Sequence, residues 1–566
     1  MRILSRSFLI FCVVFYTQIA SGAFRQPLRG KKAMVVSAHP LASDAGLEML
    51  QKGGNAIDAA VATTFAISVV EPFSAGIGGG GFLLLRNSRH RNIKALDFRE
   101  RAPLKATKNM YLDDKGKVRR DASINGYLAV GTPGTVAGMY EVHRRYGKLP
   151  WKTVVEPSVK LAKDGFIVSN RFVNAAKRRK KMIASNQEAR SIFTRDGNYY
   201  QPGEKLVQRD LGKTLEDIAA NPQSFYTGEI ARAIASDMAK NGGLITLEDL
   251  KSYKPIWREP VCGNFRKARV CSMPPPSSGG IHLLQMLNII GDTDLKSLGW
   301  HHPDAIHLLA EAMRIAYADR SEYLGDPDFV KIPQQQLISP GYAKLRRQQI
   351  NMQRANSSNQ IKPVNKETLQ KFTQTQPSRL LPVKPNPKSI LESLRGRTSP
   401  PSTFRKIQNP KSKESTETSH LTVIDEQLNA VSLTFTINLG FGAGVVTPGT
   451  GIVLNNEMDD FSAAPGVPNA FGLVGNEANS IAPLKTPLSS MTPTIVTENG
   501  RLRMAVGTPG GSTIITQVLQ IILNVLEYDM DAAAAVSASR IHHQWLPDTL
   551  RVEPWGLDAL TLQELK

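Results

Sequence analysis

The sequence predicts a layered fold in which helices and strands alternate. Three observations support this prediction. Residues 56–70 are small and apolar, as in a buried helix. The glycine run GIGGGG at 76–81 leads into the strand-like FLLLR, and KALDFR at 94–99 has the pattern of a neighbouring strand that ends on Arg99. With 566 residues, of which 41% are hydrophobic, the chain can bury a large core in one or two domains.

The first 22 residues have the parts of a signal peptide. Arg2 and Arg6 precede an apolar run from Phe8 to Tyr16, and small residues follow at 20–23. This run is shorter than the ~20 apolar residues of a spanning helix. We therefore expect an exported protein, periplasmic or secreted, with no membrane span after the signal is removed.

Residues 23–352 form the first predicted block. Ser43-Asp44 can cap a helix that ends at Gly53-Gly54, with Leu47 and Leu50 on one face. Further along, CGNFRKARVC predicts a hairpin whose turn lies between Arg266 and Lys267 and whose ends are Cys262 and Cys271. The two cysteines are either bridged or remain buried thiols. No cysteine and histidine spacing suggests zinc, and we expect no metal and no cofactor.

Residues 353–417 are predicted to be a basic, flexible linker. They contain 13 Lys or Arg, 4 Asp or Glu and eight prolines. The whole chain carries a formal charge of +21, or +19 without Arg2 and Arg6, which also fits binding to an anionic surface or to nucleic acid. Because no groove-reading motif accompanies the charge, we expect a solvated linker and no nucleic-acid partner.

Residues 418–566 open with a predicted hairpin, HLTVID and NAVSLTFTIN, and later contain a helical run at 512–528. Centring the turn on Gln427 pairs Leu421 with Leu433 and Val423 with Val431 on one face. The other face then carries Thr422 with Ser432, His420 with Thr434, and Thr418 with Thr436. This row of hydroxyls fits either a solvated strand face or a reactive one.

The position of Thr418 favours chemistry. A cut between Glu417 and Thr418 would give Thr418 a free α-amine, whose reference pKa of ~7.7–8.0 suits a base at neutral pH. Nucleophile and base would then belong to one residue. The predicted linker would leave the new terminus free to occupy a pocket.

Six stretches carry a family resemblance. They are LDFRERAP (96–103), MPPPSSGGIH (273–282), TSHLTVID (418–425), LNNEMDDFS (454–462), PLSSMTPTIV (487–496) and GTPGGS (507–512). Their order from about Ala33 to Glu553 resembles the γ-glutamyltransferases, or glutathione hydrolases, of the N-terminal-nucleophile (Ntn) hydrolase superfamily. The resemblance implies an α+β fold, a four-layer αββα sandwich. It also implies a proenzyme that cuts itself before Thr418 into a large and a small subunit, which form a heterodimer.

The resemblance also implies the roles of single residues. Glutathione or another γ-glutamyl compound would acylate Thr418, and water, an amino acid or a dipeptide would accept the γ-glutamyl group. Thr436 would hydrogen-bond the nucleophile, and the N–H groups of Gly510 and Gly511 would form the oxyanion hole. The substrate would be held at its α-carboxylate by one set of residues and at its α-ammonium by another. The first set is Arg99, Ser489 and Ser490, and the second is Asn438, Glu457 and Asp460.

The sequence departs from the family pattern in four places. Glu457 stands where some members have glutamine, and Phe471 stands where bacterial members often have a tyrosine that closes a lid, here about 465–476, onto Asn438. We therefore expect a looser lid. The linker is longer and more basic than usual. The chain also stops at Lys566, a few dozen residues before family members do, so an uncovered sheet edge is expected.

Two other functions fit the same sequence. A β-lactam side-chain acylase of this family would hydrolyse glutaryl-type amides, but it would not need Asp460 for an α-ammonium. A non-catalytic exported protein would remain uncut and bind anionic surfaces through its linker.

Overall fold

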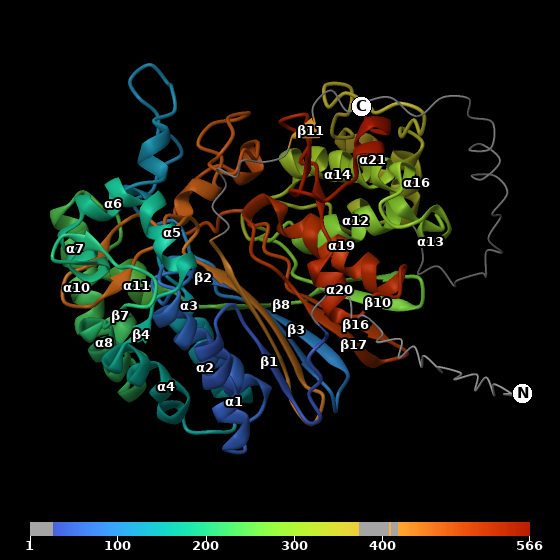
Figure 1. Cartoon of the computed structure of the whole chain (residues 1–566). Helices are drawn as coiled ribbons and strands as arrows, with labels where there is room; N and C mark the ends of the chain where they lie inside the picture. The colour runs from blue at the N-terminus through green and yellow to red at the C-terminus, as the bar shows by residue number, and fades with distance from the viewer. Residues whose placement is uncertain (1–25, 373–406, 409–416) are drawn as a thin grey trace, which may run out of the picture.

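Two antiparallel sheets lie at the centre of the computed structural model, which describes residues 26–372, 407–408 and 417–566 (Figure 1). The first sheet has the strand order β1-β12-β13-β2-β3-β8. Its strands are β1 (Met34–Val36), β12 (Ser419–Ile424), β13 (Ala430–Thr436), β2 (Gly80–Asn87), β3 (Asn92–Asp97) and β8 (Ile256–Arg258). Strands from the two ends of the chain therefore share one sheet.

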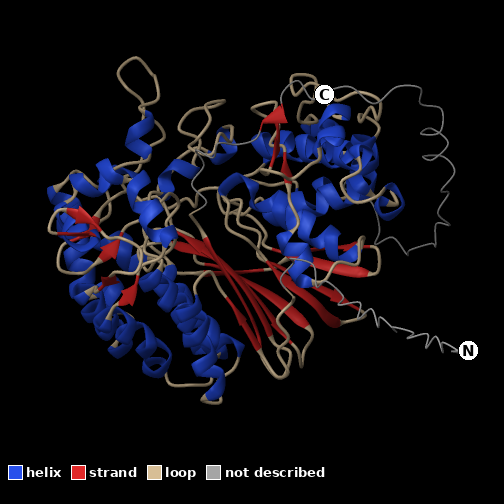
Figure 2. Cartoon of the chain, viewed as in Figure 1, coloured by secondary structure: helices blue, strands red, loops and turns tan. Residues whose placement is uncertain are grey.

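The second sheet has the order β17-β16-β10-β9 and packs against the first. Its strands are β17 (Arg501–Val506), β16 (Thr494–Glu498), β10 (Ala268–Ser272) and β9 (Val261–Phe265). Helices cover the outer face of each sheet, as Figure 2 shows in blue around the red strands. The predicted α+β sandwich of helix, sheet, sheet and helix layers is confirmed.

The longer helices fall into two groups by the core that they join. The first group, on the outer face of the first sheet, is α1 (Pro40–Gln51), α2 (Ala56–Val70), α3 (Thr135–Tyr146), α4 (Trp151–Asp164), α8 (Arg209–Ala220) and α10 (Glu229–Lys240). The second group, beside the second sheet, is α12 (Gly279–Ile290), α14 (Pro303–Tyr323), α16 (Pro340–Arg347) and α19 (Ile514–Leu526).

Shorter elements connect these layers. The helices are α5 (Asn170–Arg178), α6 (Lys180–Ser185), α7 (Gln187–Phe193), α9 (Ser224–Thr227), α11 (Leu247–Ser252), α13 (Leu295–Leu298), α15 (Gln334–Leu337), α17 (Lys366–Gln370), α20 (Ala532–Ser537) and α21 (Ala559–Glu564). The strands are β4 (Phe166–Ile167), β5 (Thr194–Arg195), β6 (Asn198–Tyr199), β7 (Lys205–Leu206), β11 (Ile407–Gln408), β14 (Val446–Thr447), β15 (Ile452–Val453), β18 (Ile541–His542) and β19 (Leu550–Val552). In the described part of the chain, no helix is both long and apolar enough to span a membrane.

The hairpin of β12 and β13 has the predicted register. Leu421 pairs with Leu433 and His420 with Thr434. The apolar face packs on the helices of the first group. The hydroxyl face is not solvated: Ser432 and Thr434 are fully buried, and Ser432 donates to the carbonyl of Val506 on the second sheet at 3.0 Å. This face therefore lies between the two sheets.

The structure changes two details of the sequence prediction and settles one alternative that the sequence left open. Helix α1 begins at Pro40 with His39 as its cap, so Ser43 and Asp44 lie within the helix; proline is well tolerated in a first turn because its missing N–H would be unpaired there. Cys262 and Cys271 form a disulfide across β9 and β10, which settles the two alternatives.

The second change concerns the linker. Packed structure extends into the range predicted as flexible, because Ile361 and, in α17, Leu369 join the second core. Residues 373–406 and 409–416 of the predicted linker lie outside the described residues, as does the predicted signal peptide, 1–22.

Candidate active site

Two threonine hydroxyls face each other at the open end of the β12 and β13 hairpin. The Oγ1 atoms of Thr418 and Thr436 are 3.2 Å apart. Thr436 Oγ1 accepts from the N–H of Asn438 at 2.8 Å and lies 3.2 Å from the carbonyl oxygen of Glu417, to which it can donate. Since Thr436 has only one hydroxyl proton, donation to Glu417 requires Thr418 to donate to Thr436. The geometry therefore links the nucleophile candidate to the carbonyl group that precedes it.

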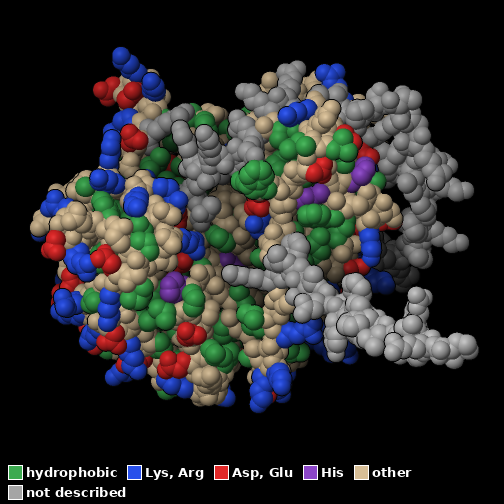
Figure 3. Space-filling model, viewed as in Figure 1, with side chains coloured by type: hydrophobic (Ala, Val, Ile, Leu, Met, Phe, Trp, Pro, Cys, Tyr) green, Lys and Arg blue, Asp and Glu red, His purple; other side chains and the backbone are tan. Residues whose placement is uncertain are grey.

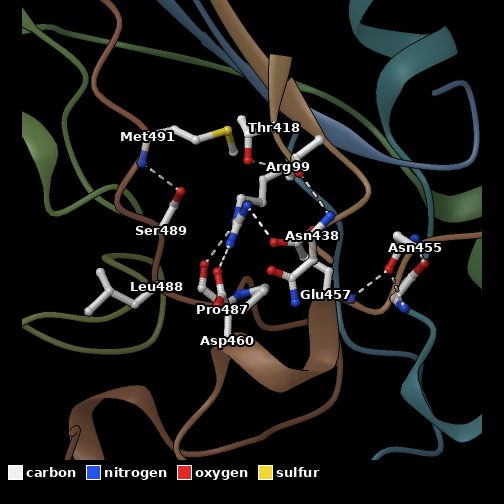
Figure 4. A network of polar contacts seen from close by, with 12 residues as sticks. Arg99, Thr418, Asn438, Asn455, Glu457, Asp460, Pro487, Leu488, Ser489 and Met491 are labelled. Carbon is white, nitrogen blue, oxygen red and sulfur yellow. Dashed lines mark hydrogen bonds and ion pairs between the residues drawn. The ribbon is translucent and has the colours of Figure 1, made fainter. Parts of the chain in front are cut away.

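Arg99 is a buried cation that lines the site. Its side chain is 1% exposed, and it follows β3, which positions it at the end of the first sheet. The guanidinium binds Glu457 at 2.7 Å through Nη1 and Asp460 through Nη2 (Figure 4). Its Nε donates to the carbonyl of Pro487 at 3.3 Å. Two carboxylates and one carbonyl thus fix the fork of this arginine.

Carboxyl groups outnumber cations around Arg99. Glu100 is fully buried next to it, beside the carboxyl group of Glu457. Burial raises the pKa of Glu100 to about 7 and raises that of Glu457 well above its ordinary value, although Arg99 opposes both shifts. Burial also raises the pKa of Asp460. An additional positive group would therefore be stabilised here.

Two serines and an asparagine complete the polar lining. Ser489 Oγ accepts from the N–H of Met491 at 3.0 Å, whereas the buried Oγ of Ser490 has no hydrogen-bond partner among the described residues. The side chain of Asn438 donates to the carbonyl of Asn456 at 2.9 Å. A buried hydroxyl without a partner is unfavourable unless a ligand satisfies it.

Gly510 and Gly511 precede α19 and close the other side of the site. Both have positive φ, +138° and +56°, which only glycine adopts without strain. A Cβ on Gly511 would lie 2.5 Å from the ring of Phe471. Gly511 lines a small pocket, of about 20 Å³, together with most of the predicted site residues, which are Arg99, Thr418, Thr436, Asn438, Glu457, Asp460, Ser489 and Ser490. Gly510 adjoins this pocket through its peptide bond to Gly511.

The comparisons with known proteins identify a family. The gamma-glutamyltranspeptidase family model matches residues 42–566. This chain belongs to that family. A glutathione hydrolase proenzyme of Escherichia coli K12 is 46% identical over 543 residues, which cover 95% of this chain and 86% of that protein.

Solved structures of the family include two kinds of enzyme. The cephalosporin acylase of Bacillus halodurans superposes with a TM-score of 0.78 at 28% identity and covers 98% of this chain and 91% of its own. A chain of the Helicobacter pylori gamma-glutamyltranspeptidase has a TM-score of 0.59 at 44% identity and covers 62% of this chain and 100% of its own. Family membership alone therefore does not distinguish the acylase activity from the transpeptidase activity, and the residues of the pocket must do so.

Sequence reasoning missed two asparagines that hold the site together. Asn455 accepts from the N–H groups of Gly131 and Glu457 through Oδ1, and Asn456 accepts from that of Leu439. Both asparagines are fully buried. The signal was present in LNNEMDDFS, because adjacent asparagines between apolar and acidic residues are unusual unless each is satisfied inside the protein.

The lid segment around Phe471 is held without a tyrosine hydroxyl. Asp459 accepts from the N–H of Ala470 at 2.9 Å, and Gln544 donates to the carbonyl of Phe471 at 3.1 Å. The amide of Asn469 reaches Asp460 at 3.3 Å. The expectation of a looser lid rests on one missing bond and stays a prediction beside these three contacts.

His420 lies on the same strand face as Thr418 but has other partners. Its ring nitrogens make hydrogen bonds with Thr434 at 2.9 Å and with Thr422 at 3.1 Å. Burial lowers the pKa of His420 to about 3, so the ring is neutral at physiological pH. This arrangement indicates a structural residue.

We expect His420→Gln to keep turnover within about tenfold of the unaltered enzyme in protein that has already been cleaved, because an essential base contributes ~10²–10⁴-fold. The measurement is kcat for glutathione per cleaved molecule. A loss of ~10³-fold would assign the base to His420 instead of the α-amine of Thr418.

Proposed function

We propose that this protein is a self-cleaving γ-glutamyltransferase and glutathione hydrolase. One arrangement carries the proposal. The paired hydroxyls of Thr418 and Thr436 lie next to the carbonyl of Glu417. A buried cluster of Arg99, Glu457 and Asp460 lines the same pocket. The pocket thus combines a nucleophile with charges of both signs.

Self-cleavage follows from the threonine pair. Thr418 Oγ1 attacks the carbonyl carbon of Glu417, a C–O bond forms and the C–N bond to Thr418 breaks. The hydroxyl proton passes by way of Thr436 to the departing nitrogen, which becomes the α-amine. Water then hydrolyses the ester. The products are a carboxylate on Glu417 and a free amino terminus on Thr418.

The same hydroxyl then acts on substrate. The new α-amine removes its proton at neutral pH, and Thr418 takes the γ-glutamyl group of glutathione as an ester. The N–H groups of Gly510 and Gly511 stabilise the oxyanion; losing one such donor costs ~10²–10³ in turnover. Water, an amino acid or a dipeptide then receives the γ-glutamyl group.

The charges of the pocket select the acyl group. Arg99 with Ser489 and Ser490 binds the α-carboxylate, and Ser490 supplies a hydroxyl that lacks a partner in the described chain. Asn438, Glu457 and Asp460 bind the α-ammonium, which offsets the excess of buried carboxyl groups. A γ-glutamyl group brings one charge of each sign and therefore suits the site.

The proposal includes processing and location. A signal peptide at 1–22 directs export to the periplasm or the exterior. Residues 23–417 become the large subunit, with 353–417 at its end, and residues 418–566 become the small catalytic subunit. The two remain together as a heterodimer because β12 and β13 of the small subunit lie between β1 and β2 of the large one.

A second candidate is a side-chain acylase, which the similarity to a cephalosporin acylase favours. Glutaryl groups carry no α-ammonium, so Glu457 and Asp460 would both lack a cationic ligand group. We expect kcat/KM for glutathione to exceed that for a glutaryl amide by at least ~30-fold, the equivalent of ~2 kcal/mol for one unsatisfied buried charge.

The test compares both substrates on purified protein that a denaturing gel shows to be cleaved. Preference for the glutaryl amide would replace the transferase with the acylase. A chain that stays whole and turns over neither substrate would support the non-catalytic alternative.

A further inference from the structure

The residue before the cleavage site is held by an arginine from a distant part of the chain. Glu417 is only 2% exposed, and its Oε1 forms an ion pair with Arg178, the last residue of α5. Its Oε2 is buried and has no hydrogen-bond partner in the described residues. Arg178 is therefore the direct partner of a carboxylate that burial would otherwise destabilise.

A second ion pair, between Glu71 and Arg171, lies beside the pair of Glu417 and Arg178. Glu71 is buried and binds Arg171, in the first turn of α5, at 2.8 Å. It also accepts from Ser74, whose carbonyl lies 3.5 Å from the hydroxyl of Thr436. Two buried carboxylates lie close together here, so the direct contact with Arg178 and the charge of Arg171 both stabilise the buried Glu417 carboxylate. Burial raises the pKa of both carboxyl groups, and the arginines oppose this.

We propose that Arg178 is a positioning residue for self-cleavage, because it anchors the side chain of Glu417 and thereby aligns the carbonyl that Thr418 attacks. The inference rests on the proposed function. The carbonyl oxygen of Glu417 lies 3.2 Å from the hydroxyl of Thr436. Without Arg178, the carboxylate would turn toward solvent and carry the attached carbonyl away from that hydroxyl.

Arg171 also favours the ionised form of Glu417 through its charge, but the cations next to Arg178 in the sequence do not share its role. Arg178 belongs to the run Lys177-Arg178-Arg179-Lys180-Lys181, and Figure 3 shows Lys and Arg side chains gathered where Figure 1 places α5 and α6. Arg179 instead donates to the carbonyls of Gly440 and Gly442. Lys177 is exposed, and in the described residues it forms no ion pair. Lys177→Ala is therefore a matched control for loss of one positive charge.

The role ends when the chain is cut. The ester to Thr418 is hydrolysed, so Glu417 is no longer attached to the nucleophile. Arg178 is absent from the residues that line the pocket of Thr418. Turnover of cleaved enzyme should therefore be independent of Arg178, whereas a general loss of packing would lower both processing and turnover.

The experiment follows conversion of the purified full chain into two fragments on a denaturing gel, and then measures glutathione turnover per cleaved molecule. We expect Arg178→Ala to slow conversion by about tenfold, the effect of moderate coupling between contacting charges. Lys177→Ala should convert at the unaltered rate. The exchange Arg178→Glu with Glu417→Arg should convert faster than either single change, since it restores opposite charges.

Three results would overturn the proposal: unaltered conversion in Arg178→Ala, an exchange no better than its single variants, or an equal loss of turnover after cleavage. Failure of the proposed function gives a different pattern, because the unaltered chain would then remain whole and both proposals would fall.

Discussion

Replacing Thr418 with alanine should leave one uncut chain without measurable turnover. Thr418 Oγ1 contacts Thr436 and belongs to the residue that follows the carbonyl of Glu417. Alanine removes the atom that attacks both that carbonyl and the substrate. The scale for removing a catalytic nucleophile is on the order of 10⁶-fold in kcat. The measurements are a denaturing gel after long incubation and an assay with glutathione.

Two other threonine variants make this test specific. Thr418→Ser retains a hydroxyl and should still cleave. Thr422 lies on the same face of β12, but its side chain contacts His420 and does not line the pocket. The Thr422→Ala variant should therefore cleave normally. Two fragments from Thr418→Ala would show that another residue starts the reaction.

The second large effect is expected at Arg99. Arg99→Ala removes the cation that would bind the α-carboxylate and leaves Glu457 and Asp460 buried without their partner. Truncating one member of a buried charge pair costs ~2–5 kcal/mol, so KM for glutathione should rise by at least ~30-fold. Arg99→Lys should recover little, because one ammonium cannot reproduce the fork that reaches several oxygens.

Controls separate binding from folding. Arg101→Ala changes a partly exposed arginine nearby, which donates to the carbonyl of Lys254 and does not line the pocket, and it should leave KM unchanged. Combining Arg99→Met with Glu457→Gln removes one charge of each sign. This double variant should regain the thermal stability that Arg99→Ala loses, but its KM for glutathione should stay raised. An unchanged KM in Arg99→Ala would remove Arg99 from the substrate site.

Local sequence patterns were sufficient to predict the hairpin of β12 and β13 and helix α2. The two-residue period of HLTVID and NAVSLTFTIN, with the turn centred on Gln427, predicted the pairing of Thr418 with Thr436, because it places Leu421, Val423, Val431 and Leu433 on one buried face. The apolar composition of residues 56–70 predicted α2 with its observed bounds. These features depend on neighbours within a few residues, so local sequence specifies them.

The contacts of the site could not be read from those patterns. The hydroxyl face fitted a solvated strand equally well until the second sheet was seen to cover it through Ser432 and Val506. Likewise, local spacing gave no reason to place Arg99 between Glu457 and Asp460, which lie more than 350 residues away in the chain. The order of family motifs predicted their roles but not their mutual contacts.

The sequence by itself determined the family, the nucleophile candidate and the hairpin that presents it. Only the tertiary structure decided that Arg178 reaches Glu417, that His420 is occupied by two other threonines, and that Ser490 keeps a hydroxyl without a partner in the described chain. Short-range patterns fix which face of a strand or helix is apolar. Which distant charges meet depends on how sheets and helices pack, because a buried charge is stable only where the completed fold brings it a partner.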